Sequence, residues 1–178
     1  MATDSSNVRV AVTGEISVAP TGTAAPTTAV SALNVAFVGL GYVSEDGVTE
    51  SRERSTTDIK AWQNADTVRT VVTDANLSYT FRLIETTEAT LELFYGSAAA
   101  SGSLVVTPST TGGRQSFVID VVDGDEALRI YIPEGEVSEV GDVVYASGEA
   151  IGYEVTIRAY PDATLEGSAQ IFSTSLAA

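Results

Sequence analysis

The chain has 178 residues, and its 24 acidic against 9 basic residues give a net charge of −15. This length suits one domain with a hydrophobic core, and a 44% share of hydrophobic residues indicates a folded protein, not a disordered acidic chain. The absence of cysteine and histidine excludes disulfides, zinc sites of the Cys/His type, and Ser-His or Cys-His catalysis. The few, scattered basic residues argue against stable binding to a nucleic-acid backbone.

The first residues show no targeting signal. Residues 1–10 (MATDSSNVRV) have neither the basic start nor the apolar core of a signal peptide. No apolar run approaches the roughly 20 residues that are needed to cross a bilayer. We therefore expect a protein that is made in the cytoplasm and does not bind a membrane.

Extended segments and a proline-rich stretch open the chain. Residues 8–12 and 14–19 each favour a short strand. Residues 20–29 (PTGTAAPTTA) contain Pro20 and Pro26 and only small side chains, which leaves almost nothing to bury. We expect residues 1–30 to form a strand and an extended arm, with a floppy tail as the alternative.

Residues 39–62 are expected to form a β-hairpin with unequal arms. Residues 44–47 (SEDG) have the composition of a tight turn, and β-favouring residues lie on both sides. The second arm is too polar for a core, because residues 50–55 (ESRERS) are all polar or charged. Its Trp62 could anchor either the core or an interface. A long, charged, β-capable arm predicts a surface for another chain.

The rest of the chain predicts further strands and one helix. Residues 86–96 favour a helix, since Thr86 or Thr87 can cap its start and Gly96 can end it, although alternating Leu91, Leu93 and Tyr95 leave a strand as the alternative. Strands are expected at residues 67–73, 77–84, 104–107, 114–122, 127–132, 152–160 and 168–174, with turns at 74–76, 123–125, 133–135 and 141–142.

Together these elements predict a mainly β fold, an antiparallel sandwich or barrel with one short flanking helix. Residues 31–178 would form its single domain. No constellation of residues indicates an enzyme, a metal or a cofactor. The acidic stretch at Asp123, Asp125 and Glu126 reads as a hairpin turn and not as a calcium loop, because a strand resumes at once. The paired glycines lack the spacing of a phosphate loop.

Several spaced motifs carry a resemblance. They are GTAAP at residues 22–26, GYVSEDGVTE at 41–50, DIKAWQ at 58–63, and ETTEA with LFYG within 85–96. In this order they resemble the major tail tube proteins of long-tailed, non-contractile bacteriophages, and the actinobacteriophage type most of all. The resemblance covers roughly residues 14–160.

The resemblance implies a tail-tube-like barrel whose six copies form a ring, with rings stacked into a tube that conducts DNA from capsid to host. It implies a virion protein, assembled in the host cytoplasm, whose partners are its own copies, a tape-measure protein, a tail terminator and baseplate or tip proteins. A long hairpin and an N-terminal arm would join the rings. The implied contact residues are Tyr42, Glu45, Asp46, Glu50, Arg52, Glu53, Arg54, Asp58, Lys60, Trp62, Pro20 and Pro26.

Charge suits a channel that DNA passes without being bound. Six chains at −15 each carry roughly −90 per ring, and an acidic bore repels a polyanion. The residues expected to face the bore are Glu53, Asp58, Asp120 and Asp123. Two other classes compete with this interpretation: a capsid-decoration or adhesion-type β-sandwich, which needs no long hairpin, and a carbohydrate-active enzyme, for which a single tryptophan is too few.

Overall fold

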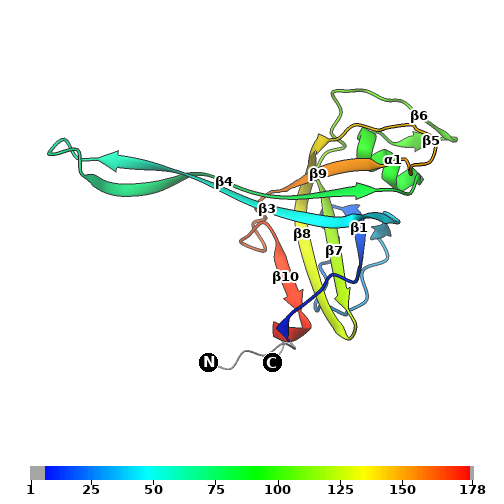
Figure 1. Ribbon diagram of the computed structural model, residues 1–178, viewed down its shortest axis with the longest axis horizontal. Coiled ribbons are helices and arrows are strands. Elements are labelled where there is room, and N and C mark those ends of the chain that lie inside the picture. The colour runs from blue at the N-terminus through cyan, green and yellow to red at the C-terminus, as the bar shows by residue number, and fades with distance from the viewer. Residues whose placement is uncertain (1–6, 177–178) are drawn as a thin grey trace.

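One antiparallel sheet organises the chain in the computed structural model, which describes residues 7–176 (Figure 1). Its strands are β1 (Thr13–Pro20), β2 (Val38–Gly39), β3 (Val43–Lys60), β4 (Thr67–Leu83), β7 (Gln115–Asp123), β8 (Glu126–Val140), β9 (Tyr153–Ala159) and β10 (Gln170–Ser173). A helix, α1 (Glu88–Tyr95), a small hairpin of β5 (Ala99–Ala100) and β6 (Ser103–Leu104), and a 3-10 turn (Thr174–Leu176) complete the described elements.

The sheet is curved but not closed. Its strand order is β2-β1-β7-β8-β9-β4-β3, with β10 paired to β8. The expectation of a mainly β, antiparallel fold with one short helix is therefore confirmed, while a closed barrel is not formed. β3 pairs only with β4, and Figure 1 shows these two strands leaving the body together.

The hydrophobic core lies on one face of the curved sheet. Alternate residues of five strands point into it, among them Ile16, Phe81, Phe117, Ile132 and Val155, all at most 2% exposed. The helix closes one end of this core through Leu93 and Phe94. Because side chains from both ends of the sheet share one cluster, the sheet must curl around them.

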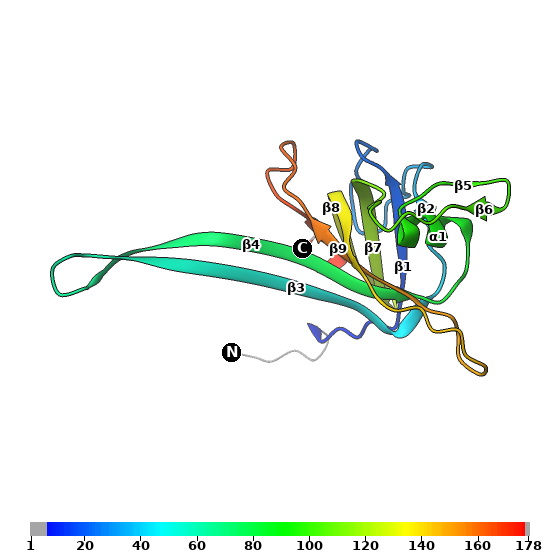
Figure 2. The same ribbon diagram turned by 90° about the horizontal axis from the view of Figure 1, so that it is seen from above.

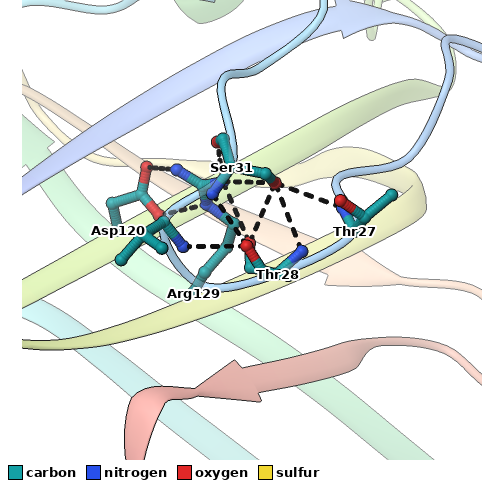
Figure 3. A network of polar contacts seen from close by, with 6 residues as sticks. Thr27, Thr28, Ser31, Asp120 and Arg129 are labelled. Atoms are coloured by element: carbon teal, nitrogen blue, oxygen red, sulfur yellow. Dashed lines mark hydrogen bonds and ion pairs between the residues drawn. The ribbon is translucent and has the colours of Figure 1, made fainter.

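On the opposite face, the chain's own segment between β1 and β2 lies against β8, where Thr23, Thr28 and Ser31 accept hydrogen bonds from Tyr131 and Arg129. Arg129 holds this segment in place (Figure 3). Its Nε and Nη2 donate to the two carboxylate oxygens of Asp120 at 2.6 and 2.9 Å, and its Nη1 donates to the carbonyls of Thr28 and Ser31 at 3.2 and 2.6 Å. The stretch expected to be a free arm is thus bound to the sheet, and Pro26 is buried.

Local signals account for the helix. Thr87 is its N-cap, and the Thr87 Oγ1 accepts from the backbone N of Thr90 at 3.2 Å. Gly96 ends it in the left-handed conformation, with φ of 64°. The buried Thr90 also donates through its hydroxyl to the Leu40 carbonyl at 3.1 Å, which fixes the helix to the chain between β2 and β3.

Five local expectations are wrong. Residues 44–47 are an irregularity within β3, where the register passes from Val43↔Leu83 to Val48↔Phe81, and not the turn of a hairpin. Residues 74–76 continue β4, and 133–135 continue β8. Residues 8–12 form no strand, and the strand expected at 104–107 is reduced to the end of β6.

Glu126 joins segments near both ends of the described chain. Its carboxylate accepts hydrogen bonds from Thr174 Oγ1 and Ser175 Oγ, and it forms an ion pair with Arg9 at 3.3 Å. The hydrogen bond from Thr174, followed by the charge of Arg9, lowers the pKa of Glu126. A pKa lowered by folding gives stability that is present above the unfolded-state pKa and is lost as the pH falls through the folded-state value.

We therefore expect hydrogen-exchange protection of β10 to fall when the pH drops through the acidic range below the pKa of an unfolded glutamate. Glu126→Gln should show the weaker protection already at neutral pH and lose the pH response. The measurement is exchange mass spectrometry of β10 peptides, expressed as protection factors so that intrinsic pH effects cancel. Equal protection in both proteins at neutral pH would contradict this role.

Candidate intersubunit surface

The most exposed feature of the molecule is the hairpin of β3 and β4. The two strands pair from Val43↔Leu83 to Lys60↔Thr67, but β9 pairs with β4 only from Leu77 to Leu83. Beyond Leu77 the hairpin therefore has no neighbouring strand. Figures 1 and 2 show it projecting far from the body. All residues of β3 from Thr49 onward are exposed.

The hairpin keeps its shape through its own residues. Residues 49–60 of β3 are mostly charged or hydroxyl side chains, whereas β4 is rich in Thr and Val, which favour strands. Cross-strand contacts tie the arms, as where Thr70 Oγ1 donates to Asp58 at 2.6 Å. The chain reverses at residues 61–66, where the Ala61 N donates to the Asp66 carbonyl at 2.7 Å and Asn64 and Ala65 take positive φ.

Charge separates the hairpin from the body. Residues 49–80 hold four basic and five acidic residues, a net charge of −1, so the remaining chain carries −14 of the total −15. The basic residues of the hairpin are Arg52, Arg54, Lys60 and Arg69. None of these four makes an ion pair within residues 7–176. The arm thus presents unpaired positive groups next to a strongly acidic body.

The root of the hairpin borders a groove of about 780 Å³. Glu50, Arg52 and Leu77 line one side of the groove. Ala169, just before β10, and Ile171, within β10, line the other. Tyr79 forms part of the floor. Burial, followed by the charge of Glu50, raises the pKa of the Tyr79 phenol, so this hydroxyl stays protonated and can donate to the Glu50 carboxylate.

A second hollow, of about 380 Å³, marks the seam where the sheet fails to close. It lies between the β1 residues Thr13 to Ile16 and the start of β3, and Tyr42 and Glu45 line it. β2 pairs only with Ser17 and Val18 of β1, and β3 has no partner besides β4. Two strand edges are therefore open at the seam, and open edges invite pairing with another chain.

The structure distributes the predicted contact residues over three places. Tyr42, Glu45 and Asp46 lie at the seam, where the Tyr42 side chain is 75% exposed. The projecting arm and its tip carry Glu50, Arg52, Glu53, Arg54, Asp58, Lys60 and Trp62. Pro20 ends β1 at the surface, whereas Pro26 is buried against its own chain.

The four acids expected to face a channel do not share one surface of the single chain. Glu53 and Asp58 are an odd number of positions apart on β3, so their side chains point to opposite faces of the hairpin. Asp120 is paired with Arg129 at 2.6 Å, and Asp123 accepts from the Val10 N at 2.9 Å. Their position in an assembly stays a prediction.

Sequence reasoning missed one residue that stabilises the fold and three that lie on the hairpin. Arg129 binds the segment between β1 and β2 to the sheet, but the sequence around a single arginine in a strand does not show which distant residues it contacts. Arg69 lies opposite Ile59 near the hairpin tip, in a segment that was expected to be an ordinary strand. Val68 and Val72, at 66% and 50% exposure, lie in the same segment.

Other types of site find no support in the described residues. No three His, Cys, Asp or Glu side chains of residues 7–176 are grouped so that they could hold a metal ion. No helix in that part of the chain is long and apolar enough to cross a membrane. The distinctive features that remain are the projecting hairpin and the open seam.

Solved structures with the same fold come from injection-system tubes. The chain aligns over 97% of its length with all of a chain in the extended PVC sheath-tube complex of an extracellular contractile injection system, at 9% identity and a TM-score of 0.54. A chain of the PVC sheath/tube terminator gives 10% identity and 0.52, with 94% of this chain and 99% of that chain covered. A chain of the tube-terminating cap of the anti-feeding prophage gives 10% identity and a TM-score of 0.50, with 98% of this chain and 100% of that chain covered.

At such low identity these structures establish the fold alone. No curated protein sequence matches the chain. A sequence family does match, over residues 1–177, and its description is phage tail tube protein. The chain belongs to the phage tail tube protein family.

Proposed function

We propose that six copies of this chain close into a ring and that the rings stack into the tail tube of a long-tailed, non-contractile phage. The observation that carries this proposal is the hairpin. It projects beyond β9, every β3 residue from Thr49 onward is exposed, and four of its basic side chains make no ion pair in the described chain. A structural protein of this family needs a contact from one ring to the next, and the hairpin supplies a surface for it.

Ring closure would use the open seam. The outer edge of β1 before Ser17 and the outer edge of β3 lack strand partners among the described residues. If neighbouring copies pair these edges, the curved sheets join into one continuous barrel around a channel. The pairing would also remove the aggregation hazard that two free edges pose to a monomer.

The channel would conduct DNA without holding it. A body charge of −14 leaves few groups that could bind phosphate. Our candidates for the bore are Asp120, Asp123 and one of Glu53 and Asp58, since these last two point to opposite faces of the hairpin. A tape-measure protein would occupy the growing tube, with a terminator at one end and baseplate or tip proteins at the other. Assembly would take place in the host cytoplasm.

Reversing the charge of Arg52 and Arg54 tests the stacking contact. We expect R52E/R54E to remain folded, because both side chains are exposed, and to lose tube assembly, because the arm would then repel the acidic body. Sedimentation and negative-stain imaging measure the assembled fraction. R52Q/R54Q is the matched control. Its assembled fraction should lie between those of the unmodified chain and R52E/R54E, since it removes attraction without adding repulsion. Undiminished assembly of the reversed variant would contradict the proposed role of the arm.

A further inference from the structure

The tip of the hairpin carries an apolar group that the single chain does not bury. Trp62, the only tryptophan, is 99% exposed. Ile59 and Val68 beside it are 50% and 66% exposed. Tryptophan is among the residues most enriched at the energetic centres of protein interfaces, and an apolar cluster at the end of a projecting arm indicates a contact.

An apolar hollow lies on the other side of the molecule. It has a volume of about 320 Å³ and is framed by α1, the loop that follows β6, and the end of β8. Leu93, Phe94, Val106, Pro108 and Val140 are among its lining residues. This volume is at the low end of the ~300–1,000 Å³ that ligand pockets span, a size that suits one aromatic side chain.

The arrangement of tip and hollow fits a head-to-tail contact. Figures 1 and 2 place the hairpin tip and α1 at opposite ends of the longest axis. A projecting group at one end and a recess at the other cannot meet within one molecule. When such surfaces join copies, each copy offers a new site to the next, as in an open stack.

The charges of the tip itself balance, because Lys60 and Arg69 are matched in number by Asp58 and Asp66. Lys60 precedes Trp62 by two positions and Arg69 lies on the opposite arm, and neither makes an ion pair in residues 7–176. The hollow is lined on its β8 side by the exposed Glu139. Docking of the tip would allow Lys60 or Arg69 to pair with this single carboxylate.

We propose that Trp62 of one copy inserts into the hollow beside α1 of a second copy in the adjacent ring. The inference rests on the proposed stacking of rings and names the partner of the hairpin tip. The contact predicts that a side chain fully exposed in the free protein becomes buried on assembly, without any change in the fold of either copy.

Fluorescence of the single tryptophan tests the burial directly, using the full-length protein before and after tube formation. We expect the emission of Trp62 to shift to the blue and its quenching by acrylamide to fall severalfold in tubes. Tubes in which emission and quenching stay as in the free protein would overturn this inference and leave ring stacking intact. Failure to form tubes under any condition would overturn both proposals.

A variant of the hollow tests its identity as the acceptor. Val140 is 51% exposed, so V140R should leave the fold intact while placing a charge in the hollow. We expect V140R to lose assembly or to assemble without the blue shift. V144R is the matched control, since Val144 is 53% exposed and does not line the hollow, and it should behave as the unmodified chain. V140R tubes with a full blue shift would show that Trp62 is buried elsewhere.

Discussion

Excising residues 55–74 and joining Arg54 to Ala75 through Asn-Gly yields a folded chain that no longer forms tubes. Arg54 and Ala75 are cross-strand partners, so a two-residue turn can connect them. The excised residues do not pair with β9 and contribute nothing to the core cluster. We therefore expect the melting temperature to change by no more than about 2 °C.

Loss of assembly should be large, because every ring would lose its contact with the next. We expect the critical concentration for tubes to rise at least about tenfold, the equivalent of 1.4 kcal/mol. The shortened chain still offers the body surface to an intact hairpin. Added in small amounts to the full-length chain, it should therefore terminate growth and shorten the tubes. Tubes of ordinary length formed by the shortened chain alone would contradict the role of the hairpin.

Replacing Arg129 with methionine is expected to destabilise the chain by about 2–4 kcal/mol, or roughly 5–15 °C in melting temperature. The Arg129 and Asp120 side chains are 8% and 20% exposed. Without the guanidinium, the carboxylate of Asp120 and the carbonyls of Thr28 and Ser31 lose their donors together. Limited proteolysis should then cut within residues 21–37 before the rest of the chain unfolds.

Arg114→Met provides the matched control. Its partner Glu134 lies 3.5 Å away in a pair that is 49% and 25% exposed, and an exposed pair contributes about 0–1 kcal/mol. In R129M, the further change Asp120→Asn should recover part of the lost stability, because it removes the uncompensated charge. If chemical denaturation gave R129M and R114M the same stability, the account of Arg129 would be wrong.

The sequence identified elements whose signals are local. The helix is one example, since Thr87, Gly96 and an apolar face all lie within a dozen residues. The strands β7 and β9 are others. The resemblance to tail tube proteins likewise depended on contiguous motifs, and the family match over residues 1–177 confirms it. That membership favours a tail tube protein over the decoration and enzyme alternatives.

The turn of the hairpin was misplaced because composition does not show which turn signal reverses the chain. The glycine-containing SEDG segment lies within β3, and the true reversal at residues 61–66 contains no glycine. There Asn64 and Ala65 take positive φ of 56°, a conformation that alanine rarely adopts. Pro133 was read as a turn although it lies in β8, where a register shift interrupts the ladder and no N–H is required.

Contacts between distant segments could not be predicted at all. The proline-rich residues 20–29 bury little by themselves, and hydrogen bonds from Arg129 to the Thr28 carbonyl and from Tyr131 to the Thr23 carbonyl help to fix them to the sheet. The seam and the hollow beside α1 arise from segments far apart in the sequence.

Electron microscopy of the concentrated, purified protein tests the central claim most directly. The account predicts hollow tubes built from stacked six-fold rings, with each hairpin reaching into the adjacent ring and the seam closed by a neighbouring copy. A reconstruction would show which acids face the bore. Tubes in which the hairpin stays free in solvent, or tail tubes of the native virion without this chain, would contradict the account.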